Sequence, residues 1–286
     1  MTRLILILFF FVFSFQSVAG ESQDPDINQA ISVIKSTYGD TVSVEQKAKT
    51  LIKFGTNPAV GSSGRFTLWY TGQDDANETY IADNLNTIDT ISSSSTSDTG
   101  VVSIEGHTMS GGNRTFVVQT ATLNGQNKVT LTTPLNRVTR VVHADQSSTD
   151  LVGEVYVYED TTISAGKPTD TTKIHLTVPA GENQSQKAST SLSSQDYWVV
   201  TGFTAGYLEK TGSNVADIRI EVKEVGGVWK PKSNPVVVTT GGNSLRIYHP
   251  YIIVPTNSDV RLTAKSSTTG QEITGDIQGY LAKKLN

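Results

Sequence analysis

The pair Asn124-Gly125 lies between two runs of alternating apolar and polar residues, and this stretch constrains the fold most strongly. After the pair, Val129, Leu131 and Leu135 fall on one face, while lysine and threonine occupy the other. Asn-Gly supplies the positive φ angles of a type I′ turn, and alternation with a period of two is typical of a half-buried strand. The sequence therefore predicts a β-hairpin here, with the turn fixing the strand register.

The same alternation recurs to the C-terminus and is clearest at Ile218, Ile220 and Val222, which are separated by charged residues. Turns rich in Gly, Pro, Asn and Ser separate such runs, and no helices are available as crossovers for a parallel sheet. The sequence predicts an all-β fold, an antiparallel β-sandwich of jelly-roll style. Two sandwich domains are expected: an N-terminal β-rich domain over 41–145 and a C-terminal β-sandwich domain over 146–286.

Residues 1–20 have the pattern of a signal peptide or membrane-targeting segment. Arg3 precedes the apolar run Leu4–Phe13, and Ser17–Ala19 offers the small residues of a cleavage site. The run is too short for a transmembrane helix, which needs about 20 apolar residues. A retained membrane anchor and a wrongly assigned start codon are the alternatives to a cleaved leader.

Residues 21–40 are predicted to form a short amphipathic helix or arm. Within Asp26–Thr37, the positions of Ile27, Ala30, Ile31 and Ile34 place them on one helical face. A helix of about three turns is marginal in isolation. Its apolar face is therefore expected to pack on its own sandwich or on a neighbouring subunit.

Composition and motif spacing argue against catalysis. The net charge is −4 and cysteine is absent, so neither direct nucleic-acid binding nor a thiolate nucleophile, disulfide or thiolate metal site is expected. The histidines are dispersed without metal-ligand spacing: His107, His143, His175 and His249. His107 is predicted at a strand end or turn, His175 on a surface, and the pair Glu159-Asp160 in a solvated loop. The sequence predicts no catalytic, cofactor or metal residues, and hence a protein that is not an enzyme.

Interaction surfaces are the remaining candidates for function. Sandwich edges favour strand pairing, so contacts are expected at the Asp26–Thr37 helix and at the strands flanking Ser92–Gly100, a run predicted as an exposed loop. Trp198 and Trp229 could instead form a platform for carbohydrate, which would make host-surface glycans a partner.

Many strand and turn segments are similar to those of a family of virion structural proteins of tailed bacteriophages. The likeness runs from about Lys53 to the C-terminus and is carried by Ile88–Ser94, Val102–His107, Thr115–Gly125, Arg137, Arg140, Gly153–Asp160, Lys173–Leu176, Gly181–Ser185, Ser194–Trp198, Ile253–Arg261 and Gly279–Leu281. These segments describe strands and turns, so they specify fold and family better than biochemical role.

The resemblance implies a β-sandwich component of the virion, of the capsid decoration or head-fibre type. Such a protein would act as a homo-oligomer and through contacts with other capsid or virion proteins. The leader at 1–20 departs from this expectation, because tailed-phage heads assemble in the cytoplasm. A secreted bacterial surface or filament-forming protein is therefore one alternative hypothesis, and a carbohydrate-binding module is the other.

Overall fold

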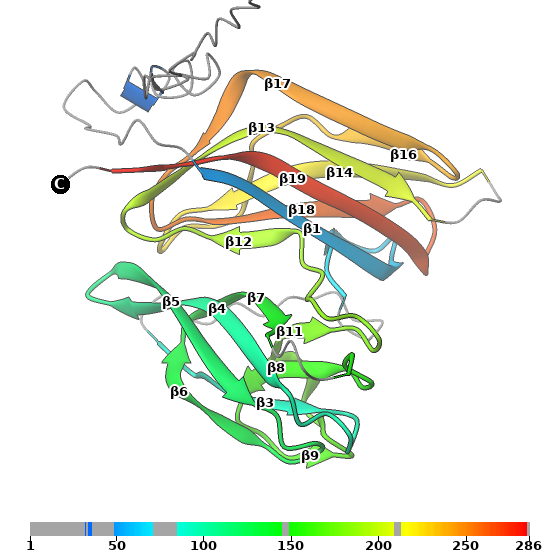
Figure 1. Cartoon of the computed structure of the whole chain (residues 1–286). Coiled ribbons are helices and arrows are strands. Elements are labelled where there is room, and N and C mark those ends of the chain that lie inside the picture. Colours follow the sequence, from blue (N-terminus) through cyan, green and yellow to red (C-terminus); the bar gives the residue numbers. More distant parts are fainter. Residues whose placement is uncertain are drawn as a thin grey trace, which may run out of the picture.

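The computed structural model describes Ser32, Ile34, Lys35 and residues 49–70, 85–144, 149–208 and 213–284 (Figure 1). Nearly every element in these ranges is a strand, and all the named strand pairs are antiparallel. The predicted all-β, antiparallel sandwich class is confirmed, while its jelly-roll style stays a prediction. The leader at 1–20 and most of the predicted helix over 26–37 lie outside the described residues. Ser32, Ile34 and Lys35 are helical, and the other described helix is the 3-10 turn η1 (Thr171–Lys173).

The first sandwich is built from the two ends of the described chain, and we call it the terminal sandwich. One sheet has the order β1 (Lys49–Val60), β19 (Gln271–Lys283), β13 (Asp196–Tyr207) and β17 (Asn243–Val254). The facing sheet has the order β12 (Ser189–Ser191), β18 (Asp259–Ser266), β14 (Val215–Lys223) and β15 (Lys230–Pro231), with β2 (Phe66–Thr67) on β18 and β16 (Val236–Thr239) on β14. Trp198, Phe203 and Ile218 are among the fully buried residues between these sheets.

The second sandwich is formed by residues 88–178, between β2 and β12, and we call it the inserted sandwich (Figure 1). One sheet has the order β11 (Ile174–Val178), β8 (Val155–Glu159), β3 (Ile88–Ser93) and β6 (Val129–Leu135). The other has the order β5 (Asn113–Thr122), β4 (Val101–Ser110) and β7 (Arg137–His143), and a small ribbon joins β9 (Ile163–Ser164) to β10 (Lys167–Pro168). Ile91, Ile104 and Leu176 belong to its core.

The sheets do not divide the chain at 145/146, the boundary predicted from the sequence. β1 pairs with β19 in continuous register from Lys49–Leu281 to Asn57–Ile273, and so belongs with the C-terminal strands. β8 and β11, which follow the predicted boundary, pair with β3 inside the inserted sandwich. Pairing between strands so distant in sequence leaves no local signal, so a composition change in a loop could not reveal it.

The predicted hairpin at Asn124-Gly125 is wrong, although a tight turn is present. Gly125 has φ +54° and the bridge Asn124–Asn127 closes the turn, but β5 pairs with β4 whereas β6 pairs with β3 in the opposite sheet. Asn-Gly specifies a chain reversal but does not choose the partner strand. The chain passes from one sheet of the inserted sandwich to the other after this turn. Leu131 of β6 is then buried in the core between the two sheets.

The tight hairpin of this region is β4–β5, closed by Gly111-Gly112. Ser110 pairs with Asn113, and the two glycines between them have φ +57° and +78°. Positive φ at both central residues is what a type I′ turn requires, and glycine adopts it without steric cost.

The Ser92–Gly100 run is not simply an exposed loop, and its flanking strands are not sheet edges. β3 lies between β8 and β6, and β4 lies between β5 and β7. Ser92 and Asp98 are buried. The hydroxyl of Ser92 donates to the Gly166 carbonyl at 2.7 Å, and the Asp98 carboxylate accepts the backbone N–H groups of Val152 and Gly153. Each flanking strand is paired on both of its sides, so neither offers a free edge for assembly.

Candidate functional site at the junction of the two sandwiches

A buried cluster of charges joins the two sandwiches. Asp259 from β18 accepts hydrogen bonds from Arg114 of β5 at 2.7 and 3.0 Å, and from Arg137 of β7 at 3.2 and 3.1 Å. The hydroxyl of Ser191 in β12 donates to the same carboxylate at 2.6 Å. Charge-assisted bonds of this type are stronger than neutral ones, so the cluster fixes the inserted sandwich against the terminal sandwich.

The electrostatics of this cluster keep Asp259 ionised. Burial opposes the charged form, but the neighbouring Arg137 and Arg114 together lower the pKa of Asp259 below its ordinary value. Two guanidinium groups share this carboxylate. The backbone of Arg114 is also held, because its N–H donates to the side chain of Asn257 at 2.9 Å.

Lys53 of β1 lies beside this cluster and is nearly buried. Its ammonium donates to the backbone carbonyl of Thr139 in β7 at 3.1 Å. Burial is the main cause that lowers the pKa of Lys53 to about 8, and the charges of Arg140 and Lys187 act in the same direction against Glu105. The bond from Lys53 to Thr139 is thus a second polar contact across the junction. Lys53 has no carboxylate hydrogen-bond partner among the described side chains.

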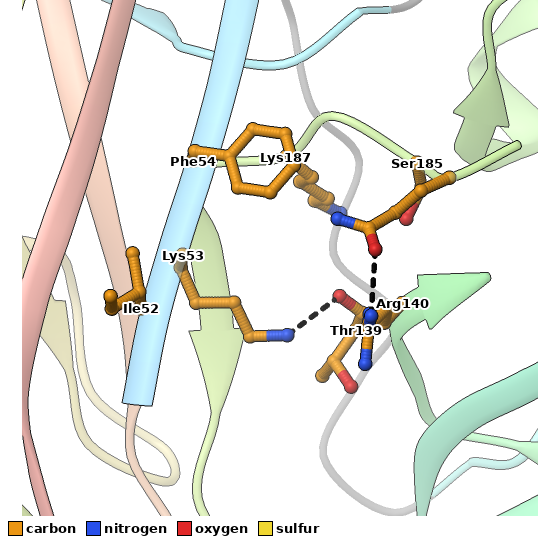
Figure 2. Close-up of a pocket in the computed structure, with 8 residues that line it drawn as sticks. Ile52, Lys53, Phe54, Thr139, Arg140, Ser185 and Lys187 are labelled. Carbon is orange, nitrogen blue, oxygen red and sulfur yellow. Dashed lines mark hydrogen bonds between the residues drawn. The ribbon is translucent and has the colours of Figure 1, made fainter. Parts of the chain in front are cut away.

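Two hollows adjoin Lys53 and Thr139. The smaller has a volume of about 30 Å³, and Figure 2 shows Lys53, Arg140 and Lys187 around it. The larger is a cleft of about 500 Å³ between β1, β5 and the chain that follows β12. A hollow of several hundred Å³ is within the range of ligand sites. The junction is therefore the candidate functional site, although the sequence alone gave no signal for it.

His107 lies inside the junction, in the interior of β4, and the prediction of a strand-end or turn position is wrong. Its ring is buried and packs edge-on against Phe116, with ring centroids 5.5 Å apart. Burial, with a further contribution from the charge of Arg114, lowers the pKa of His107 from 6.5 to about 3. The ring is therefore neutral at physiological pH.

We expect acid to destabilise the protein through His107. Between about pH 6.5 and 3 the unfolded chain binds a proton that the folded chain excludes, so stability falls as pH decreases through this window, by about 1.4 kcal/mol per pH unit from this group. Urea unfolding between pH 7 and pH 5 measures the slope, above the range in which most carboxylates titrate. His107→Gln should flatten it, while His143→Gln serves as the matched control. An unchanged slope in His107→Gln would contradict the assignment.

His175 and Glu159, also considered in the sequence, pair with each other in the inserted sandwich. His175 is buried, contrary to the surface position predicted, and its Nε2 lies 3.0 Å from the carboxylate of Glu159. This bond, together with the hydroxyl of Thr87, lowers the pKa of Glu159 to about 2 although partial burial opposes it. Glu159 is thus a structural partner and not a solvated loop charge.

The predicted carbohydrate platform is contradicted for Trp198, which is fully buried in the terminal sandwich. Trp229 stays partly exposed, with the guanidinium of Arg261 4.1 Å from its ring centre. A buried indole has no face to offer a sugar. The two tryptophans therefore cannot act together as a binding surface.

Two common kinds of functional element are absent from the described ranges. No group of three or more His, Asp or Glu side chains there could hold a metal ion. Nor does any helix in that part of the chain have the length and apolarity to cross a membrane.

Comparison with known proteins gives weak similarity to viral capsid structures. No protein-family model matches the sequence, and no curated protein is detectably similar to it. The structure of the infectious bursal disease virus Gt strain is 12% identical, with a TM-score of 0.22, and the match covers 89% of this chain and 77% of that one. The VP2 subviral particle of infectious bursal disease virus is 12% identical, with a TM-score of 0.21 and coverage of 91% and 78%. Scores this low establish neither a shared fold nor a shared function.

Proposed function

We propose that the chain is a non-enzymatic structural protein of a virion, a capsid decoration or accessory head component. It acts as a homo-oligomer and through contacts with other virion proteins. The sequence resemblance to tailed-phage virion proteins supports this role. The observation that carries it is a set of exposed apolar side chains on β1 and β17, which flank polar residues on the outer face of the sheet β1-β19-β13-β17.

This outer face is formed by residues that lie in register across four strands. One row runs Phe54, Asp276, Thr204, Leu245, and the next runs Ile52, Gln278, Gly202, Ile247. The large apolar side chains of both rows, on β1 and β17, are between 41% and 63% exposed. Clustered exposed apolar residues mark protein–protein contact sites more often than isolated ones do.

The other end of the same face is already covered. Tyr197, Val199 and Tyr251 form a small apolar cluster there, and the buried side chain of Ile34 belongs to it. The face therefore has the chemistry to bind protein, and Ile34 supports the prediction that the N-terminal arm packs on a sandwich. The exposed rows beside this cluster are proposed as the surface that meets a neighbouring subunit.

Native size measurement tests the role of the face. We expect the full chain to self-associate in sedimentation, and the double variant Leu245→Lys/Ile247→Lys to weaken association more than tenfold. The reason is that burying each aliphatic side chain contributes about 1.5–3 kcal/mol. Val237→Lys, a single change of the same kind at an exposed position of β16 in the other sheet, is the control. A chain that stays monomeric at high concentration would oppose the proposal.

Mass spectrometry of purified particles tests the virion assignment directly. The protein is expected in the particles at a fixed ratio to the major capsid protein, and its absence from them would refute the role.

A secreted bacterial surface or filament-forming protein is the second candidate, favoured by the leader pattern of residues 1–20. N-terminal sequencing of the mature chain separates the two candidates. A start at Gly20 or Glu21 would indicate export, whereas an intact leader would favour assembly inside the cell.

A further inference from the structure

The hairpin β4–β5 leaves one edge of the inserted sandwich unpaired along β5, which is the last strand of its sheet. The pair runs in one register from Ser110–Asn113 to Val101–Thr122. In a two-residue turn, the residues that flank it exchange the hydrogen bonds that close the hairpin. Because these bonds alternate along an antiparallel pair, every second residue of β5 directs its backbone N–H and C=O away from β4. The residues that point outward are Arg114, Phe116, Val118, Thr120 and Thr122.

Arg114 shows that this edge accepts partners. Its carbonyl accepts the N–H of Ser194 at 2.9 Å, and its N–H donates to the side chain of Asn257 at 2.9 Å. Within the part of the chain that the structure describes, no hydrogen bond reaches the backbone groups of the other four outward residues, from Phe116 to Thr122. A regular run of backbone donors and acceptors is therefore open beyond Arg114.

β5 also lacks the features that keep natural strand edges from pairing. Such edges are short, or they carry a charge, a proline or a bulge. From Thr115 to Thr122 the strand has neither a charge nor a proline, and its register with β4 is unbroken. The outward residues Phe116 and Val118 have side chains that are 48% and 58% exposed.

The other edge strands of the described sheets are better protected. The longer ones, β1, β6, β7 and β17, each carry a proline or an arginine: Pro58, Pro134, Arg140 and Pro250. The edge of β6 is also capped, because the Gln119 side chain donates to the Thr133 carbonyl at 2.8 Å and accepts the Thr133 N–H at 2.9 Å. The remaining edge strands have no more than five residues. Among the long edges described, β5 is the one left open.

We propose that β5 pairs with β5 of a second copy of the chain, antiparallel and about a two-fold axis at Gln119. An antiparallel pair of identical strands is symmetric, so each outward donor of one copy faces an acceptor of the other. Phe116 then lies opposite Thr122 of the partner subunit, and Val118 lies opposite Thr120 of the partner subunit. The four outward residues of each strand would form about eight backbone hydrogen bonds across the contact.

The ends of the strand favour this register. β5 ends at Thr122 and the chain turns at Asn124-Gly125, where Gly125 has φ +54°. A copy whose Thr122 lies opposite Phe116 therefore ends before it reaches the bonds already made at Arg114. The sequence also suits pairing with itself, because aromatic and β-branched side chains are favourable cross-strand partners and no like charges meet.

Cysteine crosslinking tests the contact directly, because the native chain has no cysteine. An equimolar mixture of full-length Val118→Cys and Thr120→Cys chains should form a disulfide-linked dimer under mild oxidation. Opposite residues of a hydrogen-bonded pair have Cα atoms about 5.5 Å apart, a distance that a disulfide spans. In the control mixture, Lys265→Cys, at an exposed position of the interior strand β18, replaces Thr120→Cys. Equal crosslinking in the two mixtures, or none in either, would overturn the pairing.

Sedimentation of the Leu245→Lys/Ile247→Lys variant separates this contact from the outer face of β1-β19-β13-β17. We expect this variant still to form a dimer through β5. Adding Val118→Pro should weaken that dimer at least tenfold, because proline removes an N–H that points away from β4 and costs no bond within the hairpin. Val118→Thr, which keeps the N–H and the branched shape, is the matched control and should dimerise as before. If Val118→Pro does not fold, Thr120→Pro carries the same prediction.

The contact deepens the proposed self-assembly, but the two proposals fail separately. A Leu245→Lys/Ile247→Lys variant that is monomeric and does not crosslink through positions 118 and 120 overturns the β5 contact and leaves the outer face as the source of association. A dimer that is unchanged by both proline variants also overturns it. Loss of the dimer in a folded proline variant supports the β5 contact whether or not the outer face associates.

Discussion

Asp259→Asn is expected to lower the free energy of unfolding by about 3–5 kcal/mol, the usual cost of removing one partner from a buried ion pair. The substitution keeps the size of the side chain but removes the carboxylate shared by Arg114 and Arg137, both of which are buried. It also replaces one acceptor of the Ser191 hydroxyl by an amide. Urea unfolding at pH 7 measures the loss.

A surface ion pair provides the control for Asp259. Asp160 lies 2.6 Å from Lys128, but both side chains are exposed. Asp160→Asn is therefore expected to change stability by no more than about 1 kcal/mol, since solvent screens such pairs. If the two variants were equally stable, the buried cluster would not be what holds the sandwiches together.

Trp198→Ala is expected to cost about 3–5 kcal/mol, as other truncations of buried large aromatic residues do. Trp198 is the largest fully buried side chain of the protein's described part and belongs to the core of the terminal sandwich, which contains residues from both sheets. No nearby side chain can move to fill the volume without loosening its own packing, because interiors are close-packed. Thermal and urea unfolding measure the effect.

Trp229→Ala is the matched control for Trp198. Its indole is partly exposed, and its described ring contact is with Arg261 at 4.1 Å. A cation–π contact at an exposed site contributes about 0.5–1 kcal/mol, so the loss should be several-fold smaller. Equal losses in the two variants would show that Trp198 is not the centre of this core.

Local alternation predicted individual strands well. Ile218, Ile220 and Val222 point into the core from β14, as their spacing requires. Such patterns depend only on side chains two residues apart, which is why sequence alone reveals them. The all-β class followed from the same patterns.

Local sequence patterns could not predict which strands pair or which polar side chains are buried. Asn124-Gly125 produced a turn as predicted, but the strands around it joined opposite sheets. His107 and His175 occupy alternating polar positions of strands, yet both are buried. Burial on the polar side of a strand depends on tertiary packing, which alternation along the strand does not record.

The junction shows the same limit most clearly. Arg114 and Asp259 are 145 residues apart in sequence, and Lys53 meets Thr139 across 86 residues. A single arginine or lysine in a strand gives no indication of its partner. Only the folded arrangement brings four strands from both sandwiches to one carboxylate, and this is why no site residue was predicted there.

The insertion of one sandwich within the other sets an order on biosynthesis. The inserted sandwich is contiguous, so all its strands are synthesised before β12. β1 is translated before that sandwich but pairs with β19, which is translated last of the described strands. Domains fold as units while the chain is still growing, and unpaired strands expose aggregation-prone edges. The nascent chain therefore carries β1, with its apolar Ile52 and Phe54, without its β19 partner until translation is almost finished.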